Sequence, residues 1–154
     1  MIHRSTKTYG HERGLSATYR QHSAKSHCRF LHGYSLAFKF TFEAVVLDEC
    51  GWVMDFGALR PVKAWLDSNF DHTTLVSEDD PLRDFFLEAQ ALGVMQVRLV
   101  PHTGCEAFAR MAWRFVESWL LETGYGPRVR LIAVEVSEHG ANSAIAAAED
   151  MPSG

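Results

Sequence analysis

The chain has 154 residues, of which 47% are hydrophobic and 22% charged; this is enough to bury a core, and we expect one domain over residues 1–154. Its formal net charge of −4 includes no block of like charges, which argues against a nucleic acid or an anionic membrane as a partner. No apolar run reaches the roughly 18 residues of a membrane-spanning helix and no signal peptide opens the chain, so we expect a cytoplasmic protein with three reduced cysteines.

The first two predicted elements are strands. Residues 6–21 are expected to form one strand, interrupted at Gly10 and Gly14. Residues 35–46 alternate between polar and apolar side chains, which is the pattern of a strand with one buried face. The residues expected on that buried face are Leu36, Phe38, Phe40, Phe42 and Ala44. The opposite, polar face is expected to meet solvent or a neighbouring subunit.

A turn, a short strand and a helix are predicted next. Residues 47–51 have the composition of a turn, and residues 52–56 are expected to pair back as a short strand. A helix is expected over residues 58–69, where Pro61 is tolerated only in the first turn because it lacks an N–H group.

A second helix and a further strand follow. Asp80 is predicted as the N-cap of a helix that begins at Pro81 and stops at Gly93. The apolar residues between 95 and 100 predict a strand.

The longest helix is expected to open at a capping box formed by Thr103 and Glu106 and to end near Gly124. Its apolar stripe consists of Phe108, Met111, Ala112, Phe115, Trp119 and Leu120. A final strand is expected over residues 128–138. This order of elements predicts an α+β domain with helices on one face of an antiparallel sheet.

The most informative segment is residues 28–34, in which a cysteine precedes a His-Gly-Tyr triplet. It resembles the Cys…His-Gly-His motif of the 6-pyruvoyl- and 6-carboxy-tetrahydropterin synthases, with Tyr34 in place of the second histidine. Other segments resemble the family in the same order along the chain. They are Ser-Ala-Thr-Tyr-Arg at 16–20, Gly-Trp-Val-Met-Asp-Phe at 51–56, Phe-Asp-His-Thr-Thr-Leu at 70–75, and Glu138.

The resemblance implies the tunnelling fold, in which an antiparallel sheet with helices on one face joins other subunits edge to edge into a barrel. It also implies a homo-hexamer, built as a dimer of trimers, with pterin sites at subunit interfaces. The implied reaction is that of 6-carboxy-tetrahydropterin synthase, a lyase acting on 7,8-dihydroneopterin triphosphate in the pathway to queuosine-type deazapurines. Two alternatives stay open: the 6-pyruvoyl-tetrahydropterin synthase reaction, and a non-catalytic protein that binds a pterin or purine.

The resemblance assigns catalytic roles to three residues. Cys28 is the general base toward the substrate side chain, and Asp71 with His72 orients or relays the proton. A thiol beside a histidinium ionises more readily, and a carboxylate fixes the tautomer of a neighbouring imidazole. Because strand neighbours point to opposite faces, Asp71 and His72 need a turn or helix end to cooperate. The alternative for this pair is a helix C-terminal loop with a capping histidine.

Two glutamates match pterin-contacting positions of the family. Glu138 suits charge-assisted pairing with the two donor nitrogens of a pterin edge, and its alternative is a solvated strand end. Glu106 matches the second position but also completes the capping box with Thr103. Gly104 stands where the family has a threonine, so we expect Glu106 to be mostly structural.

The family's zinc-binding positions correspond to Tyr19, His32 and Tyr34, and the last two share one face of a strand. A catalytic zinc needs three protein ligands, and neutral phenols with a pKa of about 10 bind it weakly. We therefore expect the family's zinc site to be absent, with both tyrosines filling its volume and contacting substrate oxygens. The alternative is a rearranged site in which His32 binds zinc together with His27 or His22.

Overall fold

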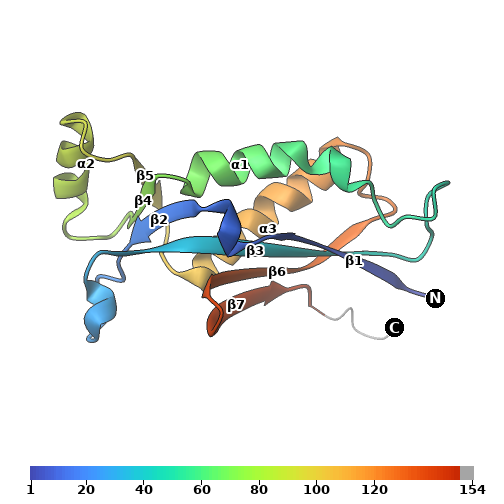
Figure 1. The fold of residues 1–154 in the computed structure, drawn as a ribbon, viewed down its shortest axis with the longest axis horizontal. Helices are drawn as coiled ribbons and strands as arrows, with labels where there is room; N and C mark the ends of the chain where they lie inside the picture. The colour runs from blue at the N-terminus through green and yellow to red at the C-terminus, as the bar shows by residue number, and fades with distance from the viewer. Residues whose placement is uncertain (150–154) are drawn as a thin grey trace.

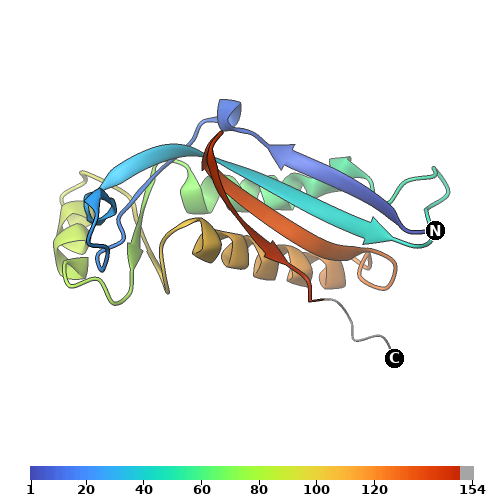
Figure 2. The ribbon, with the colours of Figure 1, turned by 90° about the horizontal axis from the view of Figure 1, so that it is seen from below.

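One sheet runs through the molecule, and two long helices cover one of its faces (Figures 1 and 2). The computed structural model describes residues 1–149. Its strands are β1 (His3–Tyr9), β2 (Leu15–Tyr19), β3 (His32–Ala44), β4 (Thr73–Ser77), β5 (Val97–Val100), β6 (Arg130–His139) and β7 (Asn142–Ala147). Its helices are α1 (Arg60–Phe70), α2 (Arg83–Ala91) and α3 (Cys105–Glu122), and its short 3-10 turns are η1 (His11–Arg13), η2 (His27–Arg29) and η3 (Phe56–Leu59).

The sheet is mixed. Its strand order is β5-β4-β2-β3-β6-β7, and β1 pairs with the second half of β3. β2 and β4 are parallel, as are β4 and β5, whereas β3 is antiparallel to β1, β2 and β6, and β6 to β7. The predicted α+β class with helices on one face is confirmed, and the β4–β5 edge is parallel where an antiparallel sheet was predicted.

β3 is the central strand because alternate side chains along it are apolar. All five predicted core positions of this strand are buried, whereas Lys39 between them is exposed. The strand starts at His32, three residues earlier than predicted, so His32 and Tyr34 lie within the sheet. The strand predicted over residues 6–21 is broken into β1 and β2 between Gly10 and Gly14, as expected.

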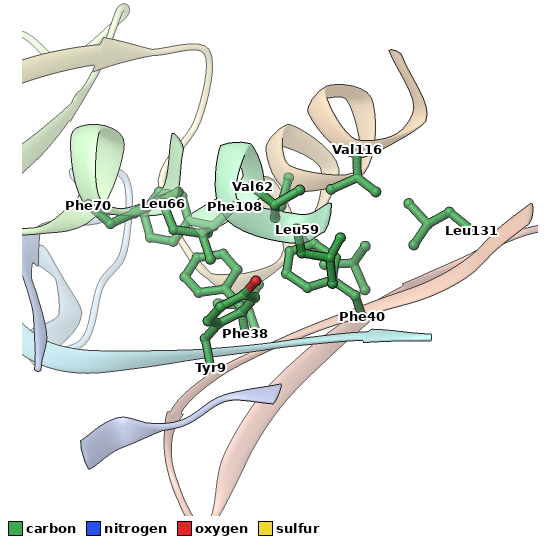
Figure 3. Close-up of a cluster of buried hydrophobic side chains, with 14 of the residues drawn as sticks. Tyr9, Phe38, Phe40, Leu59, Val62, Leu66, Phe70, Phe108, Val116 and Leu131 are labelled. Carbon is green, nitrogen blue, oxygen red and sulfur yellow. The ribbon is translucent and has the colours of Figure 1, made fainter. Parts of the chain in front are cut away.

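The core lies between the sheet and the two long helices (Figure 3). Phe38 and Phe40 project from β3 toward α1 and α3, and Phe38 lies 4.8 Å from Phe70 between ring centroids. Phe70 in turn meets Phe108 of α3 edge to face at 5.3 Å. The predicted stripe of α3 is confirmed, since its six residues are buried or packed against this core. In residues 1–149 no helix is long and apolar enough to cross a membrane.

The helix boundaries follow local chemistry with two corrections. Pro61 lies in the first turn of α1, as predicted. α2 begins at Arg83 rather than Pro81, because the Asp80 carboxylate accepts from the Leu82 N–H inside a turn that is not yet helical. The predicted capping box of α3 is wrong. Gly104 occupies the N-cap with φ +111°, a conformation that favours glycine, and no side chain caps it.

Three strand assignments also differ from the prediction. Residues 52–56 form no strand; Val53 and Met54 are buried under the helices, and the Asp55 carboxylate accepts from Gly57 N–H to start η3. β4 was not predicted because all five of its residues are buried and give no alternation, as is usual for a parallel strand. β7 was not predicted because its small side chains give no strong strand pattern.

Candidate functional site

Three aromatic side chains meet where β2 and β3 pair. Tyr19 is opposite His32 in the antiparallel register, and Tyr34 lies two residues further along β3 on the same face. The ring centroids are 5.5 Å apart for Tyr19–His32, 5.4 Å for His32–Tyr34 and 6.1 Å for Tyr19–Tyr34. Gly33 permits this close pairing, since a Cβ there would lie 2.9 Å from the Thr18 methyl group. The structure thus brings together the three positions that the sequence assigned to one pocket.

Glu138, at the end of β6, joins this aromatic cluster. The Tyr19 hydroxyl donates a hydrogen bond of 2.5 Å to Glu138 Oε1. Tyr19 is 1% exposed, and burial together with the Glu138 carboxylate raises its pKa above the ordinary value of a phenol. Burial and the same carboxylate also raise the pKa of Tyr34, whose ring lies 6.0 Å from that of His139. Both tyrosines are therefore neutral hydrogen-bonding groups at neutral pH.

Cys105 is a site residue that sequence reasoning missed. It is the first residue of α3 and is 7% exposed. Burial, with the charges of Glu138 and Glu106, raises the pKa of its thiol to about 12, so the thiol is neutral. The sequence treated this position only as part of a helix cap; an apolar-sized residue before Glu106 was the available signal.

Cys28 lies in η2, half-buried, beside the same cluster. Its N–H donates to the Ser26 hydroxyl at 3.3 Å, and its carbonyl accepts from the Gln21 N–H at 2.9 Å. The charge of a Cys28 thiolate is among those that raise the pKa of Tyr34, so the sulfur faces that ring. Cys28 and Glu138 therefore approach Tyr34 from different elements.

Arg20 fixes the segment that carries Cys28. Its guanidinium donates two hydrogen bonds to Asp80, at 2.8 and 2.6 Å, and a third to the carbonyl of Arg29 at 3.2 Å. The Arg20 carbonyl accepts from the Thr103 hydroxyl at 2.7 Å. One residue thus ties together the η2 segment, the β4–α2 turn and the loop before α3.

Replacing Asp80 by alanine is expected to lower the free energy of unfolding by about 3–5 kcal/mol, because the Arg20 charge loses its buried partner. Burial opposes ionisation of Asp80, yet the Arg20 and Leu82 hydrogen bonds hold its pKa below the ordinary value. The stabilisation is therefore present above the pKa of an unfolded aspartate and is lost as the pH falls through the folded pKa. Urea unfolding at neutral pH and near pH 3 measures both effects.

The matched control is Asp67→Ala, which breaks the more exposed ion pair with Arg13. That variant is expected to lose less than about 1 kcal/mol at either pH. Equal losses in the two variants would show that the Asp80 pair does no more than a surface ion pair.

Asp71 and His72 form the predicted pair at the end of α1. His72 has φ +52°, which turns its ring back so that Nδ1 lies 2.9 Å from Asp71 Oδ1. Burial opposes ionisation of Asp71, but the Ser16 N–H and His72 lower its pKa. The helix end lets two sequence neighbours cooperate, as expected, while the His72 side chain remains 85% exposed.

Within one chain, this pair lies away from Cys28. Asp71 bonds to Ser16 at the start of β2, whereas Cys28 bonds to Gln21 beyond its end. Five residues of extended chain span roughly 15 Å. The structure therefore brings Cys28, Glu138 and the aromatic cluster together and leaves Asp71 and His72 apart from them.

Glu106 lies exposed in the first turn of α3. Its predicted partner Thr103 donates to the Arg20 carbonyl instead, so Glu106 has no capping role. It remains close enough to Cys105 to influence that thiol. Its predicted contact with a pterin stays a prediction.

The donor set does not fit the zinc ion that the family resemblance implies. At the three equivalent positions stand one imidazole and two phenols whose pKa values are raised. In residues 1–149 no three His, Cys, Asp or Glu side chains are grouped to hold a metal ion. The alternative ligands lie elsewhere, since His22 bonds to Asp79 at 3.1 Å and His27 is exposed on η2.

Solved structures share this fold. An uncharacterized protein of Wolinella succinogenes aligns over 97% of this chain and 99% of its own, with a TM-score of 0.83 and 20% identity. The 6-pyruvoyl tetrahydropterin synthase of Plasmodium vivax aligns over 95% of this chain and 97% of its own, with a TM-score of 0.67 and 15% identity. The fold and the arrangement of its strands therefore define an α+β protein of the tetrahydropterin-synthase architecture.

The amino-acid sequence then gives the family. Residues 10–149 match 6-pyruvoyl tetrahydropterin synthase, and the chain belongs to this family, as its motifs predicted. The 6-carboxy-5,6,7,8-tetrahydropterin synthase of Rickettsia typhi is 40% identical over 57 residues, which are 36% of this chain and 41% of that protein. The chain thus spans about two fifths of the length of this relative. The Aquifex aeolicus protein of the same name is 26% identical over 135 residues, 85% of this chain and 82% of its own.

Proposed function

We propose that this protein is a pterin-processing lyase similar to 6-carboxy-tetrahydropterin synthase, acting on 7,8-dihydroneopterin triphosphate. The observation that carries the proposal is the approach of Glu138 and Cys28 to one aromatic cluster around Tyr34. Membership of the family, and the names of its relatives in Rickettsia typhi and Aquifex aeolicus, support the class of reaction.

The proposed roles follow from the chemistry of each group. The Glu138 carboxylate accepts hydrogen bonds from the donor edge of the pterin, a charge-assisted pairing. Cys28 takes a proton from the substrate side chain, and the triphosphate leaves with the electrons of its C–O bond. Asp71 holds His72 in one tautomer, and this pair receives and passes on the proton.

Because Asp71 and His72 lie apart from Cys28 within one chain, we propose that a second subunit supplies them. The outer edges of β1 and β7 support such an assembly, since in residues 1–149 each strand pairs on one side only. A homo-hexamer of two trimers, as the resemblance implies, is the proposed assembly.

A non-catalytic pterin- or purine-binding protein is the second candidate. Tyr19 and Tyr34 favour it, because they replace two metal-binding histidines of the family motif. The test is incubation of the purified protein with 7,8-dihydroneopterin triphosphate. Formation of 6-carboxy-tetrahydropterin supports the proposal, and formation of 6-pyruvoyl-tetrahydropterin supports the related synthase reaction. Tight binding without any product would contradict the lyase and support the binding protein.

Glu138→Gln is expected to weaken binding of 7,8-dihydroneopterin by about 10- to 100-fold, because a hydrogen bond to a charged group contributes about 1.5–3 kcal/mol. Calorimetric titration measures the dissociation constant. Glu135→Gln is the matched control, since Glu135 lies on the same strand but accepts from Ser143 of β7. Unchanged affinity in Glu138→Gln would remove Glu138 from the binding site.

A further inference from the structure

The Tyr19–Glu138 hydrogen bond links two strands that are not neighbours. Tyr19 belongs to β2 and Glu138 to β6, and β3 lies between them in the sheet. The Tyr19 hydroxyl is the donor and Glu138 Oε1 the acceptor. A side chain of β2 therefore sets the position of the carboxylate to which pterin binding is assigned.

The Tyr19 ring is held on several sides. Phe108 of α3 meets it edge to face at 5.0 Å between centroids, and His32 and Tyr34 lie at 5.5 and 6.1 Å. A ring that is 1% exposed and packed in this way has little freedom to change rotamer. Its hydroxyl is consequently a fixed donor, and it stays protonated because burial and Glu138 both oppose ionisation.

The three rings occupy positions that could surround a metal ion, but their atoms are of the wrong kind. Imidazole nitrogens bind zinc at about 2.0–2.1 Å, which puts the centres of three tetrahedrally arranged rings about 5 Å apart. The observed spacings of 5.4–6.1 Å are close to this value. The backbone thus retains the arrangement of a three-ligand centre, while a neutral phenol that donates to a carboxylate offers no anionic ligand.

His32, the remaining imidazole, is also fixed. Its Nδ1 lies 2.6 Å from the carbonyl oxygen of Phe30, which sets the orientation of the ring. One imidazole nitrogen is left for another partner, and a single ligand does not hold zinc at a catalytic site.

We propose that Tyr19 is a positioning residue for Glu138, and that this phenol–carboxylate pair takes the place of a metal ion in organising the site. Glu138 Oε1 accepts from Tyr19, and Oε2 together with the Tyr34 hydroxyl faces the ligand. The role in ligand binding rests on the proposed function; the hydrogen bond and the independence from metal do not.

The test compares Tyr19→Phe, which removes only the hydroxyl group, with wild type. The matched control is Tyr9→Phe, because Tyr9 is a second buried tyrosine of this sheet, on the neighbouring strand β1. Tyr19→Phe is expected to weaken binding of 7,8-dihydroneopterin about tenfold, and Tyr9→Phe to leave it unchanged. Titration of wild type with zinc chloride is expected to show no stoichiometric binding.

Proton NMR provides a readout that needs no ligand. A buried hydroxyl bonded to a carboxylate is expected to give a slowly exchanging, downfield resonance that disappears in Tyr19→Phe and shifts in Glu138→Gln. If this resonance is present but wild type does not bind 7,8-dihydroneopterin, the proposed function fails and the Tyr19–Glu138 pair stands.

Two results would overturn the inference. One is stoichiometric zinc in wild type that is lost in His32→Ala. The other is a Tyr19→Phe variant that binds 7,8-dihydroneopterin as tightly as wild type does, since the hydroxyl would then not position Glu138.

Discussion

Tyr19→His combined with Tyr34→His is expected to convert this protein into one that binds about one zinc ion per chain. The two positions lie on one sheet face with His32, at ring spacings that suit three imidazole ligands. The substitutions supply the nitrogen ligands and also remove the phenol that donates to Glu138. The effect is large because wild type offers one imidazole where zinc needs three protein ligands.

Metal analysis after dialysis measures this gain, and thermal unfolding with and without zinc measures its consequence. The double variant without zinc is expected to be less stable than wild type, since Tyr19 loses its packing against Phe108. Zinc at 100 times its dissociation constant is expected to restore about 2.7 kcal/mol. Adding His32→Ala provides the control, because it should abolish zinc binding. A folded double variant that takes up no zinc would show that the backbone does not hold these three positions for a metal.

The parts of the fold that were predicted are those with a one-dimensional signal. The alternation along β3 specified its buried face, and the helical spacing in α3 specified its stripe. β4 has no such signal, because it is buried on both faces, and its parallel pairing with β2 depends on residues more than fifty positions apart. The α3 cap failed because Thr103 has a stronger tertiary partner in Arg20 than its local one.

The site shows the same division. The period of two along β3 placed His32 and Tyr34 on one face, and the family motif added Tyr19. The Tyr19–Glu138 bond could not be predicted, because β2 reaches β6 across β3 only after all three strands have paired and β6 has passed an irregularity between Ser137 and His139. Side-chain chemistry, by contrast, was readable, since phenols at zinc positions already argued against the metal.

The position of Asp71 and His72 leads to the second large prediction. Cys28→Ala and Asp71→Asn are each expected to lower turnover of 7,8-dihydroneopterin triphosphate by about 10²- to 10⁴-fold, the usual contribution of acid–base groups. Asp71→Asn keeps an oxygen that can accept from the Ser16 N–H, so the helix end is preserved while the charge on His72's partner is lost. Cys50→Ala, at an exposed cysteine in the 47–51 turn, is the control and is expected to retain full activity.

Mixing the two inactive variants distinguishes a site within one chain from a shared site. If each site takes Cys28 from one subunit and Asp71 from another, random mixed oligomers are expected to recover about a quarter of wild-type activity, because each intact residue is present with a probability of one half. If one chain supplies both residues, every site carries one defect and no activity returns. Size-exclusion chromatography with one tagged variant establishes that subunits have exchanged. Mixed oligomers without activity would therefore contradict the shared site, and the roughly 15 Å between these groups would then need a large movement within one chain.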